Sequence, residues 1–180
     1  EGSPTHQENP YAFKIYAIEQ ALKLGYKQIL WVDSSLYPVR PLDDIINYIN
    51  DKGFYMFRTG YNLAHSVSDR TLKYAGIDRD IAERITEYAS GCVGLNFNKL
   101  DSKAVFDTWE QYMLDGQFKG SRSHDNQSND PRFLFHRQDQ SCLSLAMSIW
   151  GMYMPPDAPN FCHYYGTPQT DQTIFMIHGI

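Results

Sequence analysis

The stretch that decides the fold is Ile29-Leu30-Trp31-Val32-Asp33-Ser34-Ser35, in which four apolar residues run directly into an aspartate and two serines. An uninterrupted apolar run of this length, between Gly25 and Pro38, predicts a buried strand of an α/β sheet. The polar residues then fall at the carboxyl end of the strand, where open α/β sheets bind their ligands. Asp33 can hold a hard divalent cation there, and the cation can neutralise a diphosphate. The alternative is that Asp33 only opens a turn, a common use of aspartate.

The residues before this strand predict a helix. Asn9-Pro10 has the pattern of an N-cap followed by proline at the first helical position. Gly25 follows the helix at the usual place for a C-terminal glycine. A helix that feeds a buried strand is half of a βαβ unit, so we expect an α/β domain with a mixed sheet flanked by helices. The apolar positions on one helical face are Phe13, Ala17, Ala21 and Leu24.

The rest of the chain predicts further short elements of both kinds. Two amphipathic helices have clear apolar stripes, and residues 116–130 are polar and glycine-bearing, which is typical of a loop. The expected helices are 42–50, short turns of helix within 60–88, 104–114 and 139–150, and the expected strands are 53–58, 92–97 and 173–177.

Composition narrows the function classes. The chain has 180 residues and a net charge of −5, so it has no broad basic surface of the kind that binds nucleic acid or anionic membranes. It contains no 18-residue apolar run, so we expect no transmembrane segment, and no secretory signal is visible. The three cysteines do not form a disulfide or metal pattern, so we expect free thiols and favour a cytoplasmic location.

A second informative cluster is His136-Arg137-Gln138-Asp139-Gln140-Ser141, which directly precedes an apolar helix. Carboxylates and amides bind sugar hydroxyls with directional hydrogen bonds, so Asp139 and Gln140 are candidates for a sugar site. His136 and Arg137 would flank that site. The alternative is that Asp139 or Ser141 caps the helix and that the flanking residues are solvated.

Two further positions have both a functional and a structural interpretation. Lys14 shares a helical face with Tyr11 and can reach a phosphate, although a solvated lysine is the commoner case. The small residues of Ser90-Gly91-Cys92-Val93-Gly94 can let a ligand approach the backbone, and the segment can equally be a tight turn before a buried strand.

Several of these motifs resemble those of nucleotide-sugar glycosyltransferases with the GT-A fold. Trp31-Val32-Asp33-Ser34-Ser35 resembles their metal-binding Asp-any-Asp signature, with Ser35 as a neutral, weaker ligand in place of the second carboxylate. Asp139-Gln140 is similar to the Asp-Gln dipeptide of retaining members such as the glycogenin and lipopolysaccharide galactosyltransferase families. There the aspartate holds hydroxyls of the donor sugar, and the glutamine lies near the anomeric carbon.

The resemblance also implies roles for residues that are not informative alone. His178-Gly179 matches the C-terminal histidine and glycine that these families place at the metal, although a lone histidine is more often a surface or core residue. Gly91 would line the sugar pocket, and a carboxylate at Asp69 would touch the donor sugar. Carboxylate and imidazole suit Mn²⁺, so Asp33 and His178 are the predicted ligands of Mn²⁺ or Mg²⁺.

Together these motifs predict a single GT-A-like domain over residues 1–180 that moves a hexose from a nucleoside diphosphate sugar to a carbohydrate or other acceptor. Asp139 and Gln140 would be the catalytic residues, and Lys14, Ser35, Asp69, Gly91 and Arg137 would bind substrate. A retaining outcome follows from the resemblance alone.

Two alternatives to this function stay open. One is a non-catalytic carbohydrate-binding or assembly domain, and a weaker one is a metal-dependent phosphoesterase. The chain starts one helix before Asp33, so we expect the C-terminal two thirds of a larger domain without its first strands. An exposed sheet edge and self-association would follow.

Overall fold

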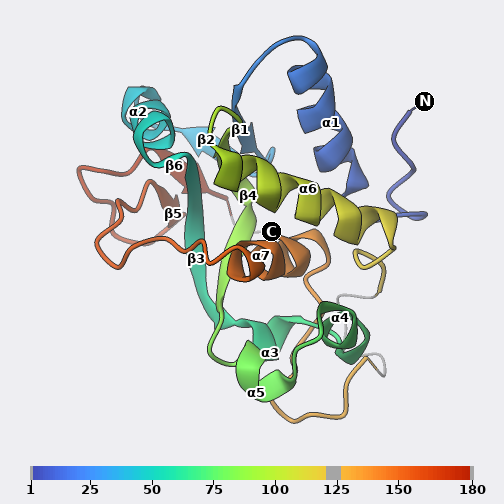
Figure 1. Ribbon diagram of the computed structural model, residues 1–180. Coiled ribbons are helices and arrows are strands. Elements are labelled where there is room, and N and C mark those ends of the chain that lie inside the picture. Colours follow the sequence, from blue (N-terminus) through green and yellow to red (C-terminus); the bar gives the residue numbers. More distant parts are fainter. Residues whose placement is uncertain (1, 121–126, 179–180) are drawn as a thin grey trace.

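The computed structural model describes residues 2–120 and 127–178. It contains helices and two small open sheets in one mixed α/β arrangement (Figure 1). The helices are α1 (Ala12–Lys23), α2 (Asp43–Lys52), α3 (Leu63–Ser66), α4 (Asp69–Ala75), α5 (Arg79–Ala82), α6 (Leu100–Leu114) and α7 (Asp139–Ile149). The strands are β1 (Gln28–Val32), β2 (Leu36–Pro38), β3 (Phe54–Asn62), β4 (Thr86–Asn96), β5 (Cys162–Tyr164) and β6 (Phe175–Ile177).

The first sheet has the strand order β1-β4-β3, and both pairings are antiparallel. The predicted strand at Gln28–Val32 is confirmed, but every residue in it is only half-buried. The prediction of a fully buried strand was wrong because β1 lies at the edge of its sheet and pairs on one side only. Such an edge presents unpaired backbone groups that can template association. Self-association itself stays a prediction.

The second sheet, with the order β2-β6-β5, joins the turn after β1 to the end of the chain. Strand β2 is antiparallel to β6, with Leu36 opposite Ile177. Strand β5 runs parallel to β6 on its other side. The backbone N–H of His178 donates to the Ser35 carbonyl at 2.8 Å. This pairing places His178 next to the residues that follow Asp33.

Helices α6 and α7 pack together and against the central strand β4, and α1 packs on β1 (Figure 1). The fully buried indole of Trp109 in α6 donates to the carbonyl of Asp139 in α7 at 2.9 Å. One continuous apolar cluster runs through these helices and both sheets. The short helices α3, α4 and α5 gather at one end of the molecule (Figure 1).

The first helix starts differently from its prediction. It begins at Ala12, and the residue at its N-cap is Tyr11 in a left-handed conformation with φ 60°. The predicted Asn9-Pro10 cap is therefore wrong. The Asn9 side chain donates instead to the Met113 carbonyl at the end of α6, at 3.1 Å, so a tertiary contact replaces the local one.

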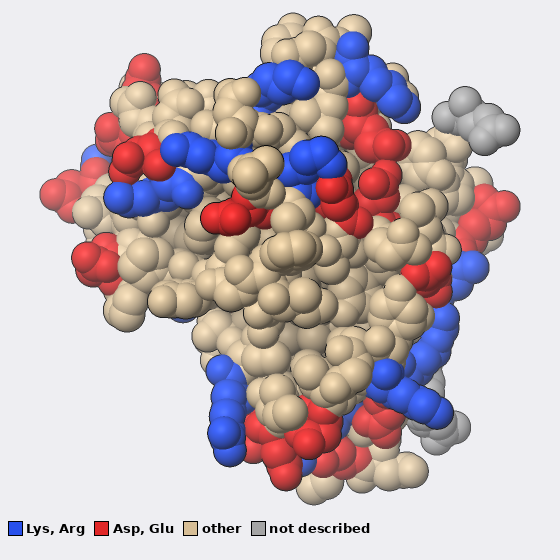
Figure 2. Space-filling view, viewed as in Figure 1, with Lys and Arg blue, Asp and Glu red and all other residues tan. Residues whose placement is uncertain are grey.

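The described surface has mixed charge. On the face shown in Figure 2, Lys and Arg side chains lie among Asp and Glu side chains around a broad uncharged area. Among the residues that the structure describes, no helix combines the length and apolar character needed to cross a membrane. The predicted loop has neither helix nor strand over residues 116–120 and 127–130, and its residues 121–126 lie outside the described part of the chain.

The three cysteines are free and buried. Hydrogen bonding with Cys162, together with burial, raises the pKa of the Cys92 thiol well above its ordinary value. Burial does the same to the pKa of Cys142. These two thiols therefore stay protonated at neutral pH and pack as small apolar side chains.

A substitution of Gly94 would test how α2 packs on β4. A methyl group there would lie 2.6 Å from Ile49 Cγ1 and 3.3 Å from Tyr55 Cβ. We expect Gly94→Ala to lower the free energy of unfolding by about 1–3 kcal/mol, measured by urea denaturation, because the core has no room for the added atom. Gly2→Ala is the control, since nothing lies within 4 Å of its added methyl. Equal stability of Gly94→Ala and the parent would show that α2 does not pack on β4 in this way.

Candidate functional site

A cavity of about 790 Å³ lies where α1, the end of β1, β4, the start of α7 and the C-terminal segment meet. This volume is in the range of small-molecule sites. It brings together residues more than a hundred positions apart in the sequence. The lining includes Tyr11, Lys14, Trp31, Asp33, Ser35, Phe57, Ser90, Gly91, Arg137, Gln138, Asp139, Gln140, Tyr164 and His178.

Lys14 is the charged centre of the site. Its side chain is 1 % exposed, and its ammonium lies 3.1 Å from Asp33 Oδ1 and 3.0 Å from Asp139 Oδ2. The same nitrogen donates to the carbonyl and the hydroxyl of Ser90 at 3.1 and 3.2 Å. Lysine is almost never fully buried unless it is paired, and here one ammonium contacts two carboxylates. The alternative of a solvated lysine is therefore wrong. The predicted phosphate contact stays a prediction, and Lys14 lines the cavity as a buried cation held by two carboxylates.

Asp33 both opens a turn and faces the cavity, so the two interpretations of its role are compatible. Its carbonyl accepts from the Leu36 N–H at 2.9 Å, which closes the turn. Its Oδ1 accepts from the Trp31 indole N–H at 2.6 Å. A methyl group added at Gly91 would lie 3.3 Å from Asp33 Oδ2. The glycine thus leaves room for the Asp33 carboxylate, and the approach of a ligand to the backbone at Gly91 stays a prediction.

Asp139 does not cap α7. The N-cap residue is Gln138, and no side chain forms a capping hydrogen bond there. The Ser141 hydroxyl instead bonds to the Ser66 carbonyl, which lies in another element. The capping alternative is therefore wrong, and Asp139 turns its carboxylate towards Lys14 because the ion pair is the stronger interaction.

Two buried polar atoms at the cavity lack hydrogen bonds among the described residues. They are Asp139 Oδ2, which has only its ion contact with Lys14, and Gln140 Nε2. Gln140 is 5 % exposed, and its Oε1 accepts from the Ser90 N–H at 3.4 Å. An unsatisfied buried group is costly, so it marks a place where a ligand or water completes the structure. An acceptor and a donor together suit a hydroxyl group, which is both.

Backbone strain coincides with this cavity. Tyr11, with φ 60°, and Gln138, with φ 53°, are the non-glycine residues with positive φ in the described part of the chain. Both line the cavity. Non-glycine residues in this region cost free energy and cluster at ligand sites and active sites. Lys14 and Asp139, which form an ion pair at the same cavity, follow these two residues closely in the sequence.

Arg137, from the loop before α7, and Tyr164, from β5, also line the cavity. The Arg137 Nη2 group donates to Gln140 Oε1 at 3.4 Å, so the guanidinium lies next to the start of α7. The Arg137 guanidinium stacks on Phe135 with its carbon 5.3 Å from the ring centroid. Burial raises the pKa of the Tyr164 phenol, and the Arg137 charge opposes this. Tyr164 is therefore a protonated phenol at neutral pH, and with Phe57 it adds an aromatic wall, their ring centroids 6.4 Å apart.

The predicted metal ligands reach the same cavity but do not form a metal site by themselves. Both Asp33 oxygens lie within 3.3 Å of the Lys14 ammonium. The His178 ring stacks on Tyr165 with centroids 5.4 Å apart. Across the described residues, no group of three or more His, Cys, Asp or Glu side chains is placed to hold a metal ion. The donors therefore do not fit a metal held by the protein alone, because a lysine already neutralises the carboxylate.

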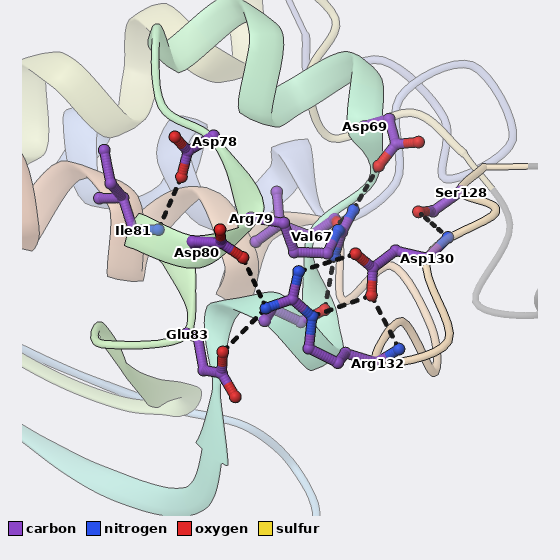
Figure 3. A network of polar contacts seen from close by, with 11 residues as sticks. Val67, Asp69, Asp78, Arg79, Asp80, Ile81, Glu83, Ser128, Asp130 and Arg132 are labelled. Carbon is purple, nitrogen blue, oxygen red and sulfur yellow. Dashed lines mark hydrogen bonds and ion pairs between the residues drawn. The ribbon is translucent and has the colours of Figure 1, made fainter.

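Asp69 does not line the cavity. It is the first residue of α4, and its Oδ1 pairs with Arg79 Nη2 at 2.5 Å (Figure 3). Arg132 joins α5 to the loop before α7 through Asp80, Glu83 and Asp130 (Figure 3). Asp69 pairs with Arg79 and is not brought together with the other predicted site residues at the cavity.

His136 is likewise structural rather than a residue flanking the site. It is fully buried, and its Nδ1 accepts from the Ser68 backbone N–H at 3.3 Å. Because Nδ1 accepts, the proton is on Nε2, which donates to the Gln117 carbonyl at 3.0 Å. Burial lowers the pKa of His136 to about 4. The neutral ring thus fixes the loop against α4.

Several residues that complete the site had another predicted role or none. Trp31 and Ser90 belong to motifs that the sequence singled out, but their contacts were not predicted. The Trp31 indole holds Asp33, and Ser90 offers its carbonyl and its hydroxyl to Lys14. Gln138 belongs to the cluster before α7, but its strained backbone was not predicted. Tyr164 was assigned no role, because an aromatic residue in a tail is common.

Comparisons of the chain with models of protein families, with curated proteins and with solved structures returned no match. The assignment of a function therefore rests on the chemistry of the cavity.

His136 predicts a pH dependence of stability. Its pKa falls from 6.5 to about 4 on folding, so below pH 6.5 the unfolded chain binds a proton that the folded chain excludes. The contribution of His136 to the free energy of unfolding is fully present above about pH 6.5. As the pH falls to about 4, the free energy of unfolding decreases by about 3 kcal/mol. We expect urea titrations over this range to show that loss in the parent and a smaller one in His136→Gln. His6→Gln, at an exposed position, should keep the parent's pH dependence.

Proposed function

We propose that this cavity binds a sugar and that the chain is a glycosyltransferase domain of GT-A type, acting on a nucleoside diphosphate sugar. The observation that carries the proposal is a pair of buried polar atoms at one cavity. Gln140 Nε2 has no hydrogen-bond partner among the described residues, and Asp139 Oδ2 has only its ion pair with Lys14. A sugar hydroxyl donates to Asp139 Oδ2 and accepts from Gln140 Nε2. An apolar ligand would leave Gln140 Nε2 unpaired, at a cost of about 1–3 kcal/mol, and would leave Asp139 Oδ2 with only its ion pair to Lys14.

The lining supplies the other features that sugar transfer needs. Gly91 lets a ligand approach β4, and Tyr11, Phe57 and Tyr164 offer rings against which a sugar face can pack. In the reaction, the bond between the anomeric carbon and a diphosphate oxygen breaks, and the nucleoside diphosphate leaves with the bonding electron pair. The oxygen of an acceptor hydroxyl bonds to that carbon, and its proton passes to the leaving diphosphate or to water. Arg137 is placed to stabilise negative charge on the departing diphosphate, because its guanidinium offers several donors in one plane.

The assignment to the GT-A type is supported by the order of the motifs in the sequence and by the position of their residues around one cavity. Asp33, Ser35, Gly91, Arg137, Asp139, Gln140 and His178 all line one cavity, as the resemblance to the GT-A families implies. The Mn²⁺ or Mg²⁺ cofactor stays a prediction. Since the protein donors do not fit a metal by themselves, no step of the proposed reaction is assigned to one.

A carbohydrate-binding domain without catalysis is the second candidate, and one observation favours it. The ion cluster has two carboxylates for one lysine, so the floor of the cavity does not attract a diphosphate. A neutral sugar would meet no such opposition. The phosphoesterase alternative has less support, because the described residues contain no metal-binding cluster of the kind that it needs.

A thermal-shift panel separates these candidates. We expect nucleoside diphosphate sugars to raise the unfolding midpoint, corresponding to about 2.7 kcal/mol at 100 times the dissociation constant. Release of nucleoside diphosphate, by transfer to an acceptor or to water, would establish the enzyme. Stabilisation by free sugars alone, with no release, would establish the binding domain. No stabilisation by any sugar or nucleotide sugar would contradict both.

Asp139→Asn tests the sugar contact. The amide keeps the shape of the carboxylate but loses its charge, and hydrogen bonds to a charged group contribute about 1.5–3 kcal/mol. We expect affinity for the sugar ligand to fall by roughly 10- to 150-fold, measured by calorimetry. Asp107→Asn, at an exposed ion pair with Lys103 on α6, is the matched control and should bind as the parent does. Equal affinities in both variants would remove Asp139 from the site.

A further inference from the structure

We propose that the Lys14 ammonium is the resident cation of the Asp33–Asp139 carboxylate pair and occupies the role that a divalent metal would otherwise have at these two side chains. The proposal deepens the proposed function, because it concerns the charge balance of the same site. Its test needs no sugar or nucleotide, so it can fail or succeed independently of that function.

The contacts of Lys14 are those of a bound ion rather than of a surface side chain. One nitrogen lies 3.0–3.3 Å from oxygens of Asp33, Asp139 and Ser90, contributed by β1's end, α7 and β4. These polar contacts are all to oxygen atoms, as for a hard cation. The Tyr11 ring lies 5.1 Å from the same nitrogen and adds a cation–π contact.

The charge of the cluster explains why a second cation is not expected there. Asp33 and Asp139 contribute two negative charges, and Lys14 returns one positive charge. A divalent ion bound between the same carboxylates would lie next to the Lys14 ammonium. Two adjacent positive charges repel strongly where little water screens them. Asp33 Oδ1 also has the Trp31 indole as a donor, which satisfies part of its capacity without metal.

The neutral Ser35 is consistent with this arrangement. It lines the same cavity, two residues after Asp33, where a second carboxylate would strengthen a metal site. With a lysine supplying the positive charge from α1, an additional carboxylate would leave the cluster more negative. Lys14 therefore supplies positive charge to the two carboxylates, and the neutral Ser35 adds no further negative charge to them.

Removal of the lysine should convert the cluster into a metal site. Lys14→Met keeps the length of the stem but leaves two facing carboxylates without a cation. In the parent, we expect MnCl₂ and EDTA to leave the unfolding midpoint unchanged. In Lys14→Met, we expect Mn²⁺ to raise the midpoint by several degrees and EDTA to reverse the rise. The added substitution Asp33→Asn should abolish the response.

Lys52→Met is the matched control, because Lys52 pairs with Asp51 at an exposed site, where both side chains are more than half exposed. It should show no response to Mn²⁺. If Lys14→Met does not fold without metal, the double variant Lys14→Met/Asp33→Asn decides. Its cluster has the parent's net charge, so it should be more stable than the single variant if Lys14 acts through charge.

Three results would overturn the proposal. One is a Mn²⁺ response in the parent that Asp33→Asn removes, since the metal would then bind beside Lys14. Another is a folded Lys14→Met that ignores Mn²⁺. The third is a double variant no more stable than Lys14→Met, because Lys14 would then act by packing. Failure of the sugar panel would leave these metal responses unchanged, so the two proposals fall separately.

Discussion

The buried ammonium of Lys14 is the interaction on which the site depends. It ties α1 to the end of β1 through Asp33, to β4 through Ser90 and to α7 through Asp139. These elements come from the first and last thirds of the chain and from its middle. Lys14 and Asp139 are buried and Asp33 is partly exposed. Burying charged groups is favourable only when their geometry is close and the remaining donors are satisfied. The ion cluster therefore requires the surrounding elements to be correctly placed, and it fixes where the cavity opens.

The surrounding structure meets that requirement with apolar packing on one side and backbone hydrogen bonds on the other. Trp109 holds the start of α7 from the core by bonding to the Asp139 carbonyl. The loop before α7 is fixed where the N–H of Arg137 donates to the Ser66 carbonyl at 3.1 Å and where His136 is enclosed. These contacts are independent of any ligand. They support the strained backbone at Gln138, and so the unsatisfied atoms of Asp139 and Gln140 stay at the cavity.

The charge balance of the cavity bears directly on its ligand. Its floor combines two carboxylates with one lysine, whereas Arg137 lies in the lining supplied by the loop. A sugar, which is neutral and rich in hydroxyls, suits the floor, and an anionic group suits the side near Arg137. This polarity is what a molecule with a sugar at one end and a diphosphate at the other would use. Because the part of the cavity near the two carboxylates suits a neutral sugar alone, a sugar-binding domain without transfer chemistry is the main alternative function.

The sequence by itself determined the local elements and the chemical types of the site. The apolar run before Asp33, the stripes of α6 and α7 and the polar Asp139-Gln140 pair are all local patterns, because periodicity and side-chain chemistry act within a few residues. Only the tertiary structure decided that Lys14 is buried, that His136 is structural, that Asp69 does not line the cavity, and that β1 is an antiparallel edge strand. Those outcomes depend on which side chains meet across long sequence separations, where the ion pair with Lys14 outweighs helix capping at Asp139 and burial keeps His136 neutral.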